Sequence, residues 1–103
     1  MPAPKWKLRN RNYRYTIKDL ELDGFTVSET SLNNSQSTLG HKHPEEEFYI
    51  FIGGLGTMMV GSDLLNPVGP GDVMYIPGNE FHQVFNIRKR KLTFICIFRK
   101  EVT

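Results

Sequence analysis

GHKHPEEEFYIFIGG, residues 40–54, places two histidines and three glutamates directly before a run of apolar residues. In an extended strand, side chains two positions apart point to the same face, so His41 and His43 share a face. Such neighbours lie about 6.7 Å apart along the strand, close enough for two imidazoles to converge on one metal ion. The spacing therefore indicates part of a metal site, although two ligands alone rarely complete one.

Further ligands are available near the ends of the predicted strands. Pro44 ends the first strand, and one of the three glutamates at 45–47 can bring a carboxylate back from the start of the next strand. The remaining histidine of the chain is His82, within YIPGNEFHQVFN (75–86). Both histidine-containing segments lie at strand ends, as a site assembled between strands requires.

Short runs rich in β-branched and aromatic residues recur along the chain, separated by Gly, Pro, Asn and Asp. No stretch has convincing helical periodicity, so the pattern predicts an all-β sandwich or barrel. The 103 residues are the size of one domain with one core. The predicted strands are 13–17, 25–32, 37–43, 47–52, 57–61, 63–68, 72–76, 82–87 and 91–98.

Two predicted strands, EFYIFI (47–52) and KLTFICIF (91–98), are apolar on both faces. A lone small barrel has a packed interior and a wet outer surface, so apolar residues on both faces require a cover on the outside. We expect either the N-terminal segment or a second subunit to supply that cover. The pattern therefore predicts a homodimer.

Residues 40–54 resemble the first characteristic motif of the cupin superfamily, and residues 71–86 resemble the second. Ser35 and Asn79 stand where cupins usually have glycine. Asn tolerates the left-handed conformation best among non-glycine residues, so we expect the turn at Asn79 to persist. The residues that match the first motif are His41, His43, Glu47 and Gly54, and those that match the second are Gly71, Pro77, His82 and Asn86.

The resemblance covers residues 25–98 and implies a double-stranded β-helix, or jelly roll, with a metal in the mouth of the barrel. We expect a basic and aromatic arm with the first strand at 1–24, and a single cupin barrel domain at 25–103. Three imidazoles and a carboxylate suit a divalent transition metal: Fe, Mn, Ni, Co or Zn. The ligands that the resemblance implies are His41, His43, Glu47 and His82.

The resemblance also implies a metal-dependent protein that acts on a small organic molecule. Fe would favour dioxygenase chemistry, whereas Mn, Ni or Zn would equally suit an isomerase or lyase acting on a sugar or hydroxy acid. Tyr49 and Phe51 share the face of Glu47 and are predicted to line the substrate pocket. No acid or base is assigned beyond the ligands, and Glu80 and Tyr49 are the only candidates. The alternative is a non-catalytic module that binds a small metabolite through the same metal.

The N-terminal segment KWKLRNRNYRY (5–15) mixes basic residues with Trp6 and two tyrosines, a pattern that occurs in single-strand nucleic-acid platforms. Binding of nucleic acid or a protein partner through this arm is a second alternative. The formal net charge is only +2, so nucleic acid is the less favoured partner. The second basic run, 88–91, is expected to form an exposed loop.

The chain contains one cysteine, Cys96, which excludes an intrachain disulfide framework and lies within an apolar run. No N-terminal apolar stretch resembles a signal peptide, and the longest apolar run, 48–61, is too short to span a bilayer. We therefore expect a soluble, cytoplasmic protein.

Overall fold

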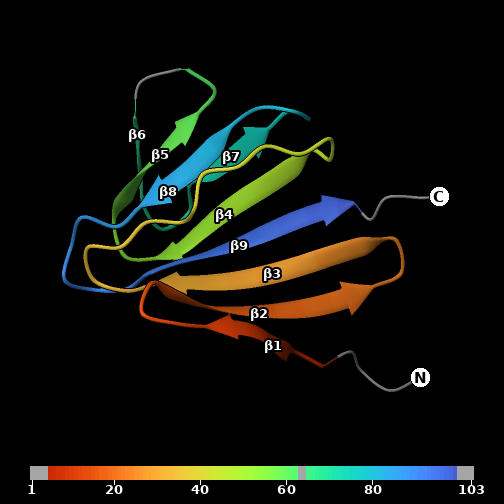
Figure 1. The fold of residues 1–103 in the computed structure, drawn as a ribbon, viewed down its shortest axis with the longest axis horizontal. Coiled ribbons are helices and arrows are strands. Elements are labelled where there is room, and N and C mark those ends of the chain that lie inside the picture. The colour runs from red at the N-terminus through yellow and green to blue at the C-terminus, as the bar shows by residue number, and fades with distance from the viewer. Residues whose placement is uncertain (1–4, 63–64, 100–103) are drawn as a thin grey trace.

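The fold is taken from a computed structural model, which describes residues 5–62 and 65–99 (Figure 1). In these ranges the chain forms strands and no helix, so no described helix is long and apolar enough to cross a membrane. The all-β prediction is confirmed. The strands are β1 (Lys7–Arg11), β2 (Tyr15–Leu22), β3 (Phe25–Leu32), β4 (Glu47–Gly53), β5 (Gly56–Val60), β6 (Asn66–Val68), β7 (Val73–Ile76), β8 (His82–Phe85) and β9 (Leu92–Arg99).

The strands form two antiparallel sheets with one core between them. The larger sheet has the order β1-β2-β3-β9-β4-β7 and the smaller has the order β6-β5-β8. Figure 1 shows the long strands β2, β3, β9 and β4 side by side, with β5 and β8 above them. Both sheets contribute fully buried apolar side chains, as expected for strands that alternate between a core face and an outer face. The most buried of these are Leu32, Phe51, Met58, Ile76, Val84, Leu92 and Phe94.

The predicted strand 37–43 is wrong. This segment makes only two isolated bridges to β8, one between Ser37 and Phe85 and one between His41 and His82. Between these bridges the Oγ1 of Thr38 accepts a hydrogen bond from the backbone N–H of Val84 at 3.0 Å, in place of a ladder bond. The chain therefore follows the edge of the smaller sheet without becoming a regular strand.

The N-terminal segment forms a hairpin in place of the expected arm with one strand. β1 and β2 pair with each other, and β2 pairs with β3, so both extend the larger sheet. The side chain of Asn12 stabilises the turn, because its Oδ1 accepts hydrogen bonds from the backbone N–H groups of Arg14 and Tyr15. The predicted strand 13–17 thus begins at Tyr15 and runs on to Leu22.

Asn86, which follows β8, holds three segments together. Its side chain is buried, and its Nδ2 lies within hydrogen-bonding distance of the carbonyl oxygens of Leu32, Asn33 and Arg90. Its Oδ1 accepts a hydrogen bond from the backbone N–H of Arg88 at 3.0 Å. A buried amide that satisfies so many backbone groups is structural, so this motif residue supports the fold at a distance from the candidate site.

The outer face of the larger sheet carries exposed apolar side chains from its edge strand β7 and from β4. Phe48 and Tyr75 pack their rings 5.2 Å apart and are 45% and 48% exposed, with Ile52 and Val73 exposed beside them on the same two strands. The N-terminal hairpin lies at the opposite edge of this sheet and leaves the patch uncovered. The predicted homodimer stays a prediction, and this is the face where we expect the second copy to lie.

We expect the protein to run as a dimer of the 11.9 kDa chain in size-exclusion chromatography with light scattering. The double substitution Phe48→Lys/Val73→Lys should shift it to monomer, because opposed lysines in a symmetric apolar contact repel and are costly to desolvate. Ile87→Lys, at an exposed loop position, is the matched control and should remain dimeric. A monomeric unsubstituted protein would contradict the prediction.

Candidate metal centre

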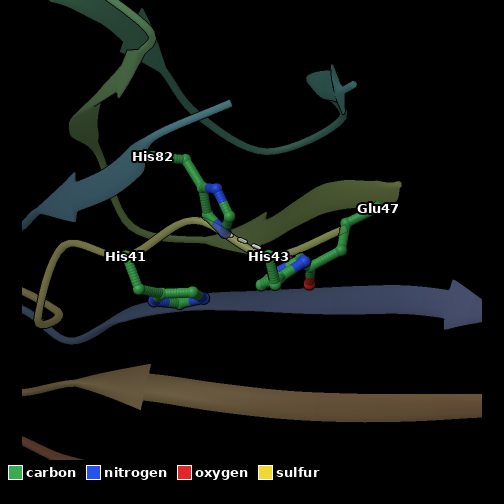
Figure 2. Close-up of side chains that lie close together, drawn as sticks. All are labelled: His41, His43, Glu47 and His82. Carbon is green, nitrogen blue, oxygen red and sulfur yellow. Dashed lines mark hydrogen bonds and ion pairs between the residues drawn. The ribbon is translucent and has the colours of Figure 1, made fainter. Parts of the chain in front are cut away.

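Four titratable side chains meet where the two sheets face each other (Figure 2). Glu47 is the first residue of β4 in the larger sheet, and His82 is the first residue of β8 in the smaller sheet. His41 and His43 come from the irregular segment between β3 and β4. One ligand atom from each residue lies within 4.8 Å of all the others. The structure thus brings together all four residues that the sequence nominated.

Backbone pairing fixes the positions of three of these residues. Glu47 is opposite Ile76 on one side and Phe98 on the other, so its strand cannot shift without breaking two ladders. His41 and His82 exchange backbone hydrogen bonds, with N–H to O distances of 3.2 and 2.9 Å. The site therefore joins the two sheets through regular β pairing and one isolated bridge.

A tight turn after β7 positions His43. Asn79 has a φ of 64° and donates its backbone N–H to the carbonyl oxygen of His43 at 2.6 Å. A Cβ atom on Gly78 would lie 2.3 Å from the carbonyl oxygen of Pro44, so only glycine permits this close approach. The left-handed conformation expected at Asn79 is confirmed. Ser35, the other position where glycine was expected, also has a positive φ, 60°.

All three imidazoles are held by the same kind of hydrogen bond. The Nδ1 atoms of His41, His43 and His82 lie 3.2, 2.9 and 2.9 Å from backbone carbonyl oxygens. A carbonyl can only accept a hydrogen bond, so each Nδ1 carries a proton, and in the neutral ring Nε2 then keeps its lone pair. The carbonyls belong to Leu39, Glu45 and Glu80, each two residues from its histidine.

The Nε2 atoms gather around the Glu47 carboxylate. Oε1 of Glu47 lies 2.5 Å from Nε2 of His43 and 3.0 Å from Nε2 of His82. Nε2 of His82 is buried and has no hydrogen-bond partner of suitable geometry among the described residues. Lone pairs and a carboxylate oxygen repel one another unless a proton or a cation lies among them. Three imidazole nitrogens and one carboxylate oxygen suit a divalent transition metal, so the donor set fits.

The same contacts shift the pKa values within the cluster. Burial acts to raise the pKa of Glu47, but the neighbouring His82 and His43 imidazoles outweigh it and lower that pKa. Burial lowers the pKa of His41, helped by the charges of His82 and His43. Burial also acts to lower the pKa of His82, but the Glu47 carboxylate and the Glu80 carbonyl raise it above its usual value. Glu47 is therefore ionised at neutral pH and ready to ligate a cation.

A cavity of about 640 Å³ adjoins the cluster. It is large enough for a small organic molecule. Figure 2 shows His41 and His43 on the side of the cluster that faces β9 and β3. The lining residues are Arg9, Tyr15, Ile17, Ser28, Thr30, Thr38, Leu39, Gly40, His41, His43, Glu45, Glu47, Tyr49, Phe94, Cys96 and Phe98.

Of the two predicted pocket residues, Tyr49 and Phe51, only one lines the cavity. Tyr49 lines the cavity, but Phe51, two residues further along β4, is fully buried in the core against Phe94 and does not reach it. Glu80 is exposed and absent from the lining, and its contribution is the carbonyl oxygen that holds His82. Phe51 is therefore a core residue, and Glu80 is not placed to act as an acid or base in the cavity.

Sequence reasoning missed several cavity residues. Arg9 and Tyr15 come from the N-terminal hairpin. From the sequence, this segment was expected to cover the outer face of the barrel or to bind a partner as an arm. Ser28 and Thr30 are buried polar side chains on the inward face of β3, and their alternation in FTVSETSL was a usable signal. Glu45, one of the three glutamates considered as a source of the carboxylate ligand, is half-buried and lines the cavity.

Comparison with known proteins settles the family. Residues 29–98 match the family model of the cupin domain. The chain belongs to the cupin family. No curated protein matches this cupin.

Solved structures share the fold of this cupin. A cupin 2 conserved barrel domain protein from Salinispora arenicola is 22% identical, with a TM-score of 0.79 over 91% of this chain and 82% of that chain. KdgF from a Halomonas species is 10% identical, with a TM-score of 0.78 over 92% and 87%. Oxalate decarboxylase from Bacillus subtilis, described with Mn(II) centres, is 16% identical, with a TM-score of 0.82 over 95% of this chain but 28% of the other. The predicted cupin jelly roll is confirmed.

In the metal-free protein we expect His82 to titrate above pH 6.5 and His41 below it, because the Glu47 carboxylate favours the protonated form of His82 while burial disfavours that of His41. Glu47→Gln removes the negative charge and should lower the pKa of His82. Ring ¹H and ¹⁵N shifts followed against pH by NMR measure both values. A His82 that titrates below His41 would refute this electrostatic description.

Proposed function

We propose that this cupin binds a divalent transition metal through His41, His43, Glu47 and His82, and acts on a small organic molecule held in the adjoining cavity. The observation that carries the proposal is that each of the three histidines bonds a backbone carbonyl through Nδ1. Their Nδ1 protons are committed to backbone carbonyls, which leaves three Nε2 lone pairs and the Glu47 carboxylate facing one another at the cavity.

A metal held there would supply Lewis acid chemistry at substrate oxygens or, if it is iron, oxygen chemistry. The protein's own contribution is positioning. The bonds to Leu39, Glu45 and Glu80 fix the imidazole orientations, as outer-shell partners do in metal sites. His41 is exposed whereas Glu47 and His82 are buried, so small molecules approach the cluster from the side of His41.

Tyr49 supports a binding role at the floor of the cavity. Burial, together with the neighbouring Cys96 and Glu47, raises the pKa of Tyr49 well above its usual value. Its hydroxyl therefore stays protonated at neutral pH, and a ligand in the cavity would compete with the Cys96 side chain for the hydrogen bond from that hydroxyl. Stacking on Phe94, with ring centroids 5.3 Å apart, holds the tyrosine ring in place.

An enzyme of the oxygenase, isomerase or lyase type is the function we favour, and a non-catalytic binding module is the alternative. Both use the same four ligands and the same cavity. We favour the enzyme because Glu45, a half-buried acidic residue outside the ligand set, also lines the cavity, and a carboxylic acid can exchange protons with a substrate. Nucleic-acid binding is not favoured, because Arg9 of the basic segment faces the cavity and the net charge is small.

Elemental analysis of the protein purified without added metal tests the metal site. We expect about one equivalent of Fe, Mn, Co, Ni or Zn per chain. Glu47→Gln should lower metal affinity at least about tenfold, because the ligand loses its charge while the side chain keeps its size. Glu46→Gln, an adjacent exposed carboxylate, is the matched control and should retain the metal.

Turnover by the metal-loaded protein distinguishes the enzyme from the non-catalytic binding module. If turnover is found with the loaded protein, Glu47→Gln should abolish it while the thermal unfolding of the metal-free form is retained. A protein that stays metal-free, and that does not take up any of the five metals when they are added back, would refute the proposal. Equal metal content in Glu47→Gln and Glu46→Gln would show that the bound ion lies elsewhere.

A further inference from the structure

The cavity also carries a positively charged residue that lies outside the four-residue cluster. Arg9 is the only Lys or Arg among the described residues that line it. The remaining charged lining residues outside the histidines are the carboxylates Glu45 and Glu47. The side chain of Arg9 is 53% exposed and pairs with Asp19, so its guanidinium lies on the cavity wall where a ligand from solvent can reach it.

A β-bulge places Arg9 in this position. In the pairing of β1 with β2, Leu8 is opposite Lys18 and Asn10 is opposite Ile17, so Arg9 is the extra residue of the bulge. Bulges occur beside functional sites, where they redirect a side chain that a regular strand would point elsewhere. Ile17, across from the bulge, also lines the cavity. The bulge in β1 thus coincides with the residue of β1 that lines the cavity.

Two side chains hold the guanidinium in place. Asp19 on β2 accepts from Nε of Arg9 at 2.8 Å, and Oγ of Ser28 on β3 accepts from Nη2 at 3.3 Å. Ser28 in turn donates to the other oxygen of Asp19 at 2.7 Å. Ser28 is 2% exposed and itself lines the cavity. Such a network fixes the planar fork of the guanidinium, which limits the entropy lost when a ligand binds.

The guanidinium still has binding capacity. Of its five N–H groups, one on Nε and one on Nη2 have the partners named above, and the other three have none within residues 5–62 and 65–99. The charge of Arg9 also extends to the cavity floor. Burial raises the pKa values of Tyr49 and Cys96 well above their usual range, and the positive charge of Arg9 opposes that rise in both.

We propose that Arg9 is a ligand-binding residue that selects small molecules with two oxygen-rich ends: a chelating end at the metal cluster and a carboxylate at Arg9. Arginine binds a carboxylate through two parallel N–H to oxygen bonds, which gives both affinity and orientation. Asp19 is a positioning residue, because it contacts Arg9 and is absent from the cavity lining. This inference rests on the proposed function, since the chelating end requires the metal.

Two probes isolate the contribution of the distal carboxylate. 2-Oxoglutarate and 2-oxopentanoate have the same five-carbon chain and the same chelating 2-oxo acid group, and differ in whether the far end is a carboxylate or a methyl group. Their affinities for the Mn(II)-loaded protein are measured by isothermal titration calorimetry, after metal content has been determined for each sample. We expect the intact protein to bind 2-oxoglutarate at least about tenfold more tightly.

Arg9→Met removes the guanidinium and keeps most of the apolar stem. It should weaken 2-oxoglutarate binding by about 10- to 100-fold and leave both 2-oxopentanoate binding and metal content unchanged. Arg11→Met, an exposed residue of the same strand, removes the same charge outside the cavity and should bind both probes as the intact protein does. A general loss of fold or of net charge would affect both probes or both variants alike.

The outcomes separate the inference from the function on which it rests. Failure to bind metal in any form refutes the proposed function, and the Arg9 inference with it. A protein that holds one metal per chain but binds the two probes equally, or binds neither, refutes the Arg9 inference alone. Equal weakening of 2-oxoglutarate by Arg9→Met and Arg11→Met also overturns it, because the effect would then be one of net charge.

Discussion

Three backbone carbonyls determine what the site can do. Each accepts the Nδ1 proton of one imidazole, so the rings of His41, His43 and His82 are fixed in one tautomer and one orientation. Their Nε2 lone pairs then gather around a buried carboxylate, which is unfavourable unless a proton or a metal cation lies among them. The rest of the fold maintains this arrangement: the bridge between His41 and His82, the central position of β4, and the close turn at Gly78 and Asn79.

Local spacing indicated the paired histidines, and the resemblance to the cupin motifs selected Glu47 among the three glutamates and added His82. Two histidines two positions apart, a glutamate four residues after the second and a third histidine at another strand end can all be read along the chain. The turn at Asn79 was predictable for a similar reason, since the tolerance of asparagine for positive φ is a local property. The regular strands other than β1 also followed, because β-branched and aromatic runs alternate with turn residues.

The cavity could not be predicted in the same way, because long-range pairing forms it. The side chain of Arg9 faces the cavity only because β1 folds back on β2, β2 pairs with β3, and a bulge interrupts the first pairing. Phe51 shared a strand face with Tyr49, but depth within the barrel, which periodicity does not report, decided which of them reached the cavity. The segment 37–43 had the composition of a strand, but the Thr38 side chain took the place of a ladder bond.

The site has two chemically different ends, and each constrains a ligand differently. The cluster requires donor atoms that a metal accepts, whereas Arg9 requires a negative charge at a distance from them. Both ends are attached to strands of the same sheet, with Glu47 on β4 and Arg9 on β1. The larger sheet therefore sets the separation of these two residues.

X-ray absorption at the metal edge of the loaded protein tests the central claim most directly, because it reports the ligand atoms themselves. Three imidazoles and one carboxylate should appear as nitrogen and oxygen scatterers at about 2.0–2.2 Å, together with the outer-shell scattering of imidazole rings. Glu47→Gln should alter the first shell and keep the imidazole signal. A first shell of oxygen atoms without imidazole scattering, or one that contains sulfur, would contradict the account, because the ion would then be bound at some other place on the chain.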